Sequence, residues 1–169
     1  VAYVPDTRPL GLVLERTVAE NASLLRGADK GFRRFGLRVR AREVEQGAAV
    51  ASAYDVRPPK PGLLAGGLSG GNQQKLMVGR ELEREPAVII VHGPTQGLDL
   101  AAASAIRRHL AAAADRGAAV VVISADLDEI LSMSDRMIVL AANSVADELP
   151  VVDGAVDMAR LGRAMGGAA

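Results

Sequence analysis

Three short apolar runs, separated by helix-forming segments, constrain the fold of this chain more than any other feature. They occupy residues 87–91, 119–123 and 137–140 of a sequence of 169 residues. Short runs rich in β-branched residues are typical of strands buried on both faces. Residues 100–116 are rich in alanine and end at Gly117, which suits the cap that terminates a helix. The alternation of strand and helix predicts an α/β fold with a parallel sheet.

The remaining segments give weaker signals. Residues 17–53 have a helical pattern, with Thr17 as an N-cap and Glu20 three positions later, as a capping box requires. Prolines in the stretch that follows exclude a helix there, because proline cannot continue one. The other predicted elements are a strand at 1–5, a loop at 57–67, a helix at 72–83, a short helix around 127–131, a small lobe or strand pair after 141 and a helix around 158–165.

Composition excludes several classes of protein. Twenty basic and twenty acidic residues cancel, so the overall charge does not suggest a nucleic-acid partner. The chain has no cysteine, which excludes disulfides and thiolate metal sites. Its apolar runs are too short to cross a bilayer, and Asp6 and Arg8 interrupt any signal peptide. We therefore expect a soluble, cytoplasmic protein, and the absence of an initiator methionine before Val1 indicates a fragment.

Residues 68–75, L-S-G-G-N-Q-Q-K, form the most informative stretch. Gly70 and Gly71 leave room for a close approach to the backbone, and Ser69 can cap a helix or donate its hydroxyl. The helix that follows directs free N–H groups and a partial positive charge to the same place, which suits a phosphate. The alternative is a flexible glycine turn before an ordinary helix.

This run resembles the signature motif of ABC ATPases, in the form typical of simple-sugar and nucleoside importers. Further segments are similar to other motifs of that family in the same order: 1–6 to the strand that enters the Q-loop, 88–99 to the Walker B strand and D-loop, 121–127 to the switch region, and 134–139 to the strand after it. The resemblance implies a P-loop NTPase core with a parallel sheet and a helical signature subdomain, and an N-terminal P-loop portion that is missing. It implies four parts: the Q-loop strand and loop (1–16), the helical subdomain (17–86), the α/β core (87–140) and a C-terminal tail (141–169).

Several catalytic positions of the family are changed in this chain. No G-x-x-x-x-G-K-S/T motif occurs in it, which truncation of a longer chain would explain. By the resemblance, His92 and Gly93 replace the two Walker B carboxylates, Ala125 the switch histidine and Asp6 the Q-loop glutamine. We expect no intact catalytic residue and no metal site, because imidazole is a poor ligand for magnesium. A lone histidine after a buried strand, with no second His, Asp or Glu at ligand spacing, is more often structural than a ligand or base, and we interpret His92 in this way. His109 is expected on the surface.

The residues that resemble the signature motif and the D-loop are retained in this chain. The resemblance implies that Ser69, Gly70, Gly71 and Asn72 bind nucleotide in trans, against the P-loop of a partner domain, with Asp99 in the D-loop. Asp99 can equally be the N-cap of the following helix. We thus expect a second, degenerate nucleotide-binding domain, part of an ABC-type ATPase although the isolated chain is inactive. The implied cofactor is ATP with Mg²⁺.

The implied partners are a second nucleotide-binding domain, transmembrane permease subunits and, indirectly, a solute-binding lipoprotein, at the cytoplasmic face of the bacterial plasma membrane. Residues 128–136 and 161–167 resemble the nucleoside branch, although sugar importers stay possible. Two alternatives stay open: a soluble, non-transport ABC ATPase, and a non-enzymatic pseudo-ATPase scaffold.

Basic residues gather in one segment: Arg26, Lys30, Arg33, Arg34, Arg38, Arg40 and Arg42. We interpret them as a solvated helical face. The alternative places them near anionic lipid or the membrane subunit. By analogy with the family, a missing P-loop strand lies between 119–123 and 137–140, so the isolated chain should be poorly stable and should not bind ATP with normal affinity.

Overall fold

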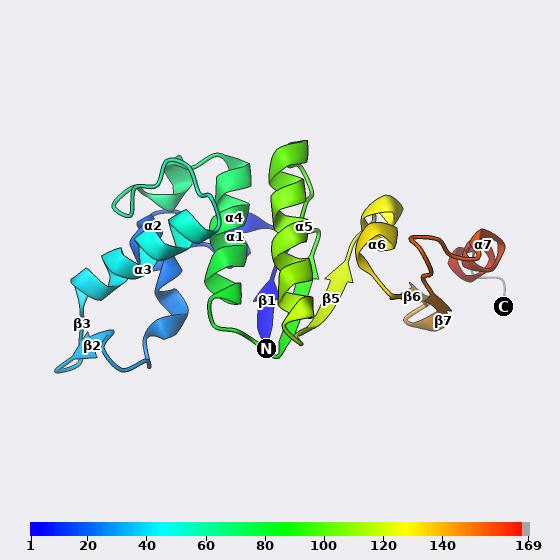
Figure 1. Cartoon of the computed structure of the whole chain (residues 1–169), viewed down its shortest axis with the longest axis horizontal. Helices are drawn as coiled ribbons and strands as arrows, with labels where there is room; N and C mark the ends of the chain where they lie inside the picture. Colours follow the sequence, from blue (N-terminus) through cyan, green and yellow to red (C-terminus); the bar gives the residue numbers. More distant parts are fainter. Residues whose placement is uncertain (167–169) are drawn as a thin grey trace. The chain divides into compact units, whose positions relative to one another are not determined.

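The computed structural model describes residues 1–166 and forms two compact units, Val1–Val121 and Val122–Ala169. Figure 1 shows the elements of both units. In chain order they are β1 (Ala2–Val4), α1 (Arg8–Gly11), α2 (Val18–Ala22), the 3-10 helix η1 (Leu24–Arg26), β2 (Arg33–Arg34), β3 (Leu37–Arg38), α3 (Arg40–Ala53), the 3-10 helix η2 (Ala65–Gly67), α4 (Gly70–Leu82), β4 (Val88–His92), α5 (Leu100–Asp115), β5 (Ala119–Ile123), α6 (Leu127–Met133), β6 (Arg136–Ala141), β7 (Ser144–Pro150) and α7 (Met158–Met165). The last residues of the expected tail, 167–169, lie outside the described residues. Within residues 1–166, no helix is long and apolar enough to cross a membrane.

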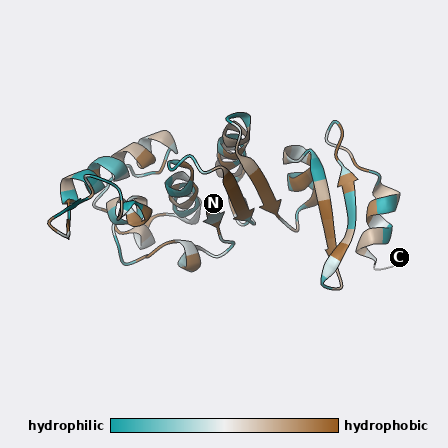
Figure 2. Ribbon diagram, turned by 90° about the horizontal axis from the view of Figure 1, so that it is seen from below, coloured by the Kyte–Doolittle hydropathy of each residue, from teal (hydrophilic) through white to brown (hydrophobic). Residues whose placement is uncertain are grey.

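A three-stranded sheet in the order β1-β4-β5 organises the first unit. β1 and β4 run parallel, with Ala2 opposite Ile89 and Val4 opposite Val91. These four residues are buried, and two neighbouring strands of this sheet are brown in the hydropathy colouring of Figure 2. The prediction of an α/β fold with parallel strands is confirmed.

The strand β5 is more open than its sequence predicts. Val121 and Ile123 are each 47% exposed, although the apolar run predicts a strand buried on both faces. β5 lies at the edge of the sheet, with β4 as its one neighbour among residues 1–166. An apolar run is buried only where other layers cover it, and at this edge the covering layer is incomplete.

Residues 17–53 do not form the continuous helical region that the pattern predicts. The ends are helical, as α2 and α3, but a two-stranded hairpin of β2 and β3 interrupts them. Its turn is made by Phe35 and Gly36, whose φ angles are 52° and 80°. Two successive residues with positive φ favour a tight hairpin turn and exclude a helix. The basic run is therefore not one helical face, because Arg33, Arg34 and Arg38 lie in the hairpin.

Capping predictions agree with the structure. Thr17 and Glu20 form a capping box at the start of α2, and Asp99 caps α5 by accepting a hydrogen bond from the Ala102 N–H at 2.8 Å. Gly117 follows α5 with a φ of 95°. In contrast, α4 begins at Gly70, two residues before the predicted start, so both glycines belong to its first turn.

The second unit has its own small core. β6 and β7 form an antiparallel pair, and Ala142 and Asn143 make the turn between them with φ angles of 49° and 61°. The expectation that 137–140 is a further buried strand of the parallel sheet is wrong. So tight a turn joins β6 directly to β7, which makes the pair antiparallel, and β6 buries only one face. The strand pair expected after 141 is not wholly there, because β7 pairs with β6, which begins at Arg136. The helix at 158–165 is present, and the core consists of Met137, Val139, Leu149 and Leu161.

Candidate functional site

The start of α4 lies at the surface of the first unit, with Ser69 exposed and the residues of the first turn half-buried. Ser69 occupies the N-cap position, yet its side chain makes no capping hydrogen bond. Instead, its hydroxyl accepts a hydrogen bond from the Asn72 side-chain amide at 2.8 Å, and Asn72 Oδ1 accepts one from the Arg57 N–H at 2.7 Å. The N–H groups of the first turn, which have no partner within the helix, are left available together with the positive end of the helix dipole. This arrangement suits an anion such as a phosphate.

Packing holds this helix start in place. The Gln73 side-chain amide donates hydrogen bonds to the carbonyls of Ala65, at 3.2 Å, and Leu68, at 3.1 Å. These bonds tie the preceding segment to the first turn of α4. Leu76, in the same helix, is completely buried and anchors it in the core of the first unit. The glycines are therefore presented on a rigid element, and the alternative of a flexible glycine turn does not describe this segment.

The start of α5 lies against the start of α4. A Cβ atom added to Gly71 would lie 3.4 Å from Ala102 Cβ and 4.0 Å from Asp99 Oδ2. Asp99 is exposed, and one of its carboxylate oxygens accepts the hydrogen bond that caps α5. The structure thus brings the retained positions Ser69 to Asn72 and Asp99 into one neighbourhood, on the surface of the first unit.

The changed positions Asp6, His92 and Gly93 form a second neighbourhood. Because β1 and β4 are parallel and in register, the residues that follow them meet at the same edge of the sheet. His92 Nδ1 lies 3.9 Å from Asp6 Oδ2, and the two side chains are 42% and 39% exposed. A Cβ atom at Gly93 would lie 3.1 Å from Gln96 Oε1 and 3.7 Å from Asp6 Cβ. Sequence reasoning missed Gln96 and the approach of Asp6 to His92, although the strand register could have revealed the latter.

These side chains do not match the ligand set that Mg²⁺ requires. Magnesium binds through carboxylates, water and phosphate oxygens, and here a single carboxylate faces an imidazole. No group of three or more His, Cys, Asp or Glu side chains in the described part of the chain could hold a metal ion. Gly93 has a φ of 55° and no side chain that could serve as a base.

Ala125 belongs to the second unit, so it is described separately from the positions above. It is exposed and lies just before α6, whose N-cap Asp126 accepts a hydrogen bond from the Glu129 N–H at 3.2 Å. Its methyl group can neither donate a hydrogen bond to a phosphate nor move a proton.

The expectation that His109 lies simply on the surface is wrong. Its ring is half-buried and packs against Tyr54, with ring centroids 4.5 Å apart. Burial, assisted by the nearby charge of Arg108, lowers the pKa of His109 below its usual value. The same surroundings raise the pKa of Tyr54 to about 12, mainly through burial. A histidine on α5 reaches this position because α3 and α5 both pack on α4, which the sequence pattern does not reveal.

Comparison with solved structures identifies the fold. The chain matches a dimeric ATP-binding cassette in a post-hydrolysis state, bound to ADP and phosphate, with a TM-score of 0.72 and 22% identity over 89% of this chain and 63% of that one. It also matches an ATP-binding subunit of an ABC transporter, with a TM-score of 0.70 and 21% identity over 99% of this chain and 64% of that one. The fold is that of an ABC ATPase.

Curated relatives give the family, whereas no protein-family model matches the chain. The chain is 42% identical to the nucleoside import ATP-binding protein NupA of Lactococcus lactis subsp. cremoris, over 83% of this chain and 28% of that protein. It is 40% identical to the ribose import ATP-binding protein RbsA 2 of Rubrobacter xylanophilus, over 88% of this chain and 28% of that protein. Most of the chain is therefore homologous to a part of the import ATP-binding proteins of the ABC family.

A third relative of this ABC chain is the guanosine import ATP-binding protein NupO of Bacillus subtilis, 36% identical over 83% of the chain. The chain spans 28% of the length of each of these three relatives. The resemblance seen in the signature stretch thus extends over most of the chain, although it covers only part of a typical family member.

Proposed function

We propose that this chain is part of a nucleotide-binding domain of an ABC importer for nucleosides or simple sugars. In this proposal Ser69, Gly70, Gly71 and Asn72 complete an ATP site whose other half belongs to a partner domain. The chain's own site is degenerate, and the assembly works with permease subunits and a solute-binding lipoprotein at the cytoplasmic face of the membrane. The relatives are named as ATP-binding proteins for the import of nucleosides, ribose and guanosine, and these names support nucleosides or simple sugars as the substrate class.

The observation that carries the proposal is the difference between the two neighbourhoods. At the start of α4, Ser69 is exposed and Gly70, Gly71 and Asn72 are half-buried, and Asp99 lies beside these groups that suit a phosphate. At the end of β4, where the family holds magnesium and orients water, His92 and Gly93 supply no carboxylate. Phosphoryl transfer depends mainly on positioning and electrostatic stabilisation, so this loss should slow hydrolysis at the chain's own site by orders of magnitude.

Two substitutions in the complete transporter test the proposal. Ser69→Arg places a bulky side chain at the start of α4, and we expect it to reduce ATP hydrolysis by about a hundred-fold, the range for losing a transition-state donor. His92→Ala should leave the rate unchanged. The matched control is Ser52→Arg, the same change at an exposed serine of α3, which should hydrolyse ATP normally.

The outcomes separate the two halves of the proposal. A normal rate in the Ser69→Arg transporter would show that α4 completes no ATP site. A loss in His92→Ala as large as that in Ser69→Arg would show that the site of this chain is active and not degenerate.

A further inference from the structure

The hairpin of β2 and β3 has an apolar tip that the first unit leaves uncovered. Phe35 is 91% exposed and Leu37 is 74% exposed. Phe35 is also an unfavourable residue for its position, since its φ of 52° suits asparagine or glycine in a two-residue turn. A large apolar ring in a left-handed conformation costs stability, and the ring gains little burial in return, since Phe35 is 91% exposed.

The segment around this tip is strongly basic, although the chain as a whole has no net charge. Residues 30–42 contain six lysines and arginines and no acidic residue. Arg38 pairs with Glu43 and Arg42 with Glu45. The others form no ion pair with the described residues, and they are Lys30, Arg33, Arg34 and Arg40.

One of these charges, that of Arg33, is placed unfavourably for the isolated chain. Arg33 lies directly opposite Arg38 across the hairpin, and like charges in such a pair repel each other. On the other face Arg34 is opposite Leu37, and its guanidinium carbon lies 5.5 Å from the centre of the Phe35 ring. Cations and exposed apolar groups therefore alternate at one small tip.

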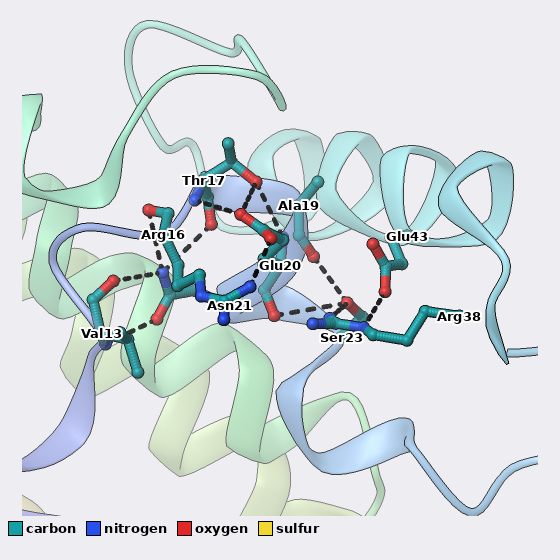
Figure 3. Close-up of polar contacts among 9 residues, drawn as sticks. All are labelled: Val13, Arg16, Thr17, Ala19, Glu20, Asn21, Ser23, Arg38 and Glu43. Carbon is teal, nitrogen blue, oxygen red and sulfur yellow. Dashed lines mark hydrogen bonds and ion pairs between the residues drawn. The ribbon is translucent and has the colours of Figure 1, made fainter. Parts of the chain in front are cut away.

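The base of the hairpin is anchored, so the tip has a defined position on the first unit. Figure 3 shows Arg38 directed at Ser23 and Glu43, and its guanidinium lies 3.5 Å from Ser23 Oγ. Ser23 Oγ in turn donates a hydrogen bond to the Ala19 carbonyl at 2.8 Å. In Figure 1 the hairpin projects beyond the N-terminal end of α3.

We propose that this hairpin binds the surface of an anionic phospholipid bilayer. Phe35 and Leu37 enter the headgroup region, while Lys30, Arg33, Arg34 and Arg40 lie among the lipid phosphates. Exposed apolar residues next to cations favour binding to such surfaces. The apolar side chains gain by burial in the bilayer, and the cations gain by attraction to the anionic lipids. The inference does not depend on which domain hydrolyses ATP.

Sedimentation with lipid vesicles tests the proposal. The full-length protein, purified without permease subunits, should bind vesicles that contain phosphatidylglycerol and not vesicles of phosphatidylcholine alone, and added salt should weaken binding. Phe35→Asn removes the ring and improves the turn, so it should weaken binding about ten-fold without unfolding the hairpin. Combined Arg33→Gln and Arg34→Gln should weaken it about twenty-five-fold, at about five-fold for each charge.

The matched control combines Arg84→Gln and Arg108→Gln, which remove two exposed charges elsewhere in the first unit and should leave binding unchanged. A direct measurement is also available, because the chain contains no tryptophan. Phe35→Trp introduces a tryptophan at the tip, and its fluorescence is the difference between the spectra of the variant and the parent protein. This emission should shift to shorter wavelength when anionic vesicles are added, because the ring leaves water, and should not shift with neutral vesicles.

Three results would overturn the proposal. These are an absence of binding to anionic vesicles, hairpin variants that bind like the control pair, and a tryptophan emission that vesicles do not change. If the hairpin variants instead lose assembly with the permease in detergent while they still bind vesicles, the tip docks on protein, and the lipid proposal is wrong.

Discussion

Single polar side chains organise the segment after β1. Asn21 is buried, accepts a hydrogen bond from the Val13 N–H at 2.9 Å and donates one to the Val13 carbonyl at 2.9 Å. Beside it, Glu20 accepts hydrogen bonds from the Thr17 N–H and from Arg16, each at 2.9 Å. Figure 3 shows these contacts converging on α2. The Thr17 N–H, followed by Arg16, lowers the pKa of Glu20 to about 2.

This lowered pKa predicts a pH-dependent contribution to stability. Because the folded pKa of Glu20 is below its usual value of 4.5, its stabilisation is complete above about pH 4.5 and is lost as the pH falls towards 2. Glu20→Gln keeps an oxygen that can accept from the Thr17 N–H but removes the negative charge, so we expect it to reduce the free energy of unfolding by about 0.3–1 kcal/mol at pH 7. Urea unfolding followed by circular dichroism should show this difference shrinking as the pH is lowered.

The control is Glu45→Gln, which removes an exposed carboxylate paired with Arg42 and should change the free energy of unfolding by less than about 0.5 kcal/mol. If the cost of Glu20→Gln were the same at pH 7 and near pH 2, the negative charge of Glu20 would not be its source.

At the scale of elements, glycines decide how closely the helices of the first unit pack. A Cβ atom at Gly47 of α3 would lie 2.7 Å from the Cα atom of Ala19 in α2. One at Gly79 of α4 would lie 2.7 Å from the ring of Tyr54. The first contact is with backbone, which cannot move aside as a side chain can, so α2 and α3 need a glycine at their crossing.

Gly47→Ala should therefore destabilise the protein, although alanine is the better helix former. We expect a loss of about 1–3 kcal/mol in the free energy of unfolding, as overpacking produces. Gly162→Ala in α7 is the matched control, because nothing lies within 4 Å of its added Cβ, and it should raise stability by about 0.5–1 kcal/mol. Thermal or urea unfolding distinguishes the two, and equal stabilisation by both substitutions would show that α2 and α3 are not in close contact.

At the scale of the whole molecule, two strands have apolar faces that no other part of residues 1–166 covers completely. Val121 and Ile123 of β5 are each 47% exposed, and Ile138 and Leu140 of β6 are 52% and 73% exposed. Exposed apolar edge strands can pair with other chains, which leads to aggregation. The expectation that the isolated chain is poorly stable follows from the same faces.

We predict that combined Val121→Lys and Ile123→Lys slow the aggregation of the 169-residue chain several-fold, measured by light scattering, because charge on an edge strand opposes pairing. Met158→Lys with Met165→Lys adds the same charge on the exposed side of α7 and should have little effect. Equal protection by both pairs would mean that net charge, rather than the edge of β5, controls aggregation.

Much of the local structure could be predicted because its causes are local. Thr17 and Glu20 form their capping box, Asp99 caps α5, and helix α7 lies at the predicted residues. The hairpin at β2 and β3 was missed because Gly31 and Gly36 are surrounded by residues that also suit a helix. The roles of Ser69 to Asn72, Asp99, Asp6, His92, Gly93 and Ala125 stay predictions.

The sequence by itself determined most of the elements outside residues 24–38, and the signature stretch, since apolar periodicity, caps and glycines act within a few residues of the chain. Only the tertiary structure decided which strands are covered, which side chains meet and which end exposed. Asp6 lies close to His92 because two strands far apart in sequence run parallel and in register. The chain reverses direction between β6 and β7 at two residues with positive φ. Such outcomes depend on burial and on long-range packing, which no local pattern records.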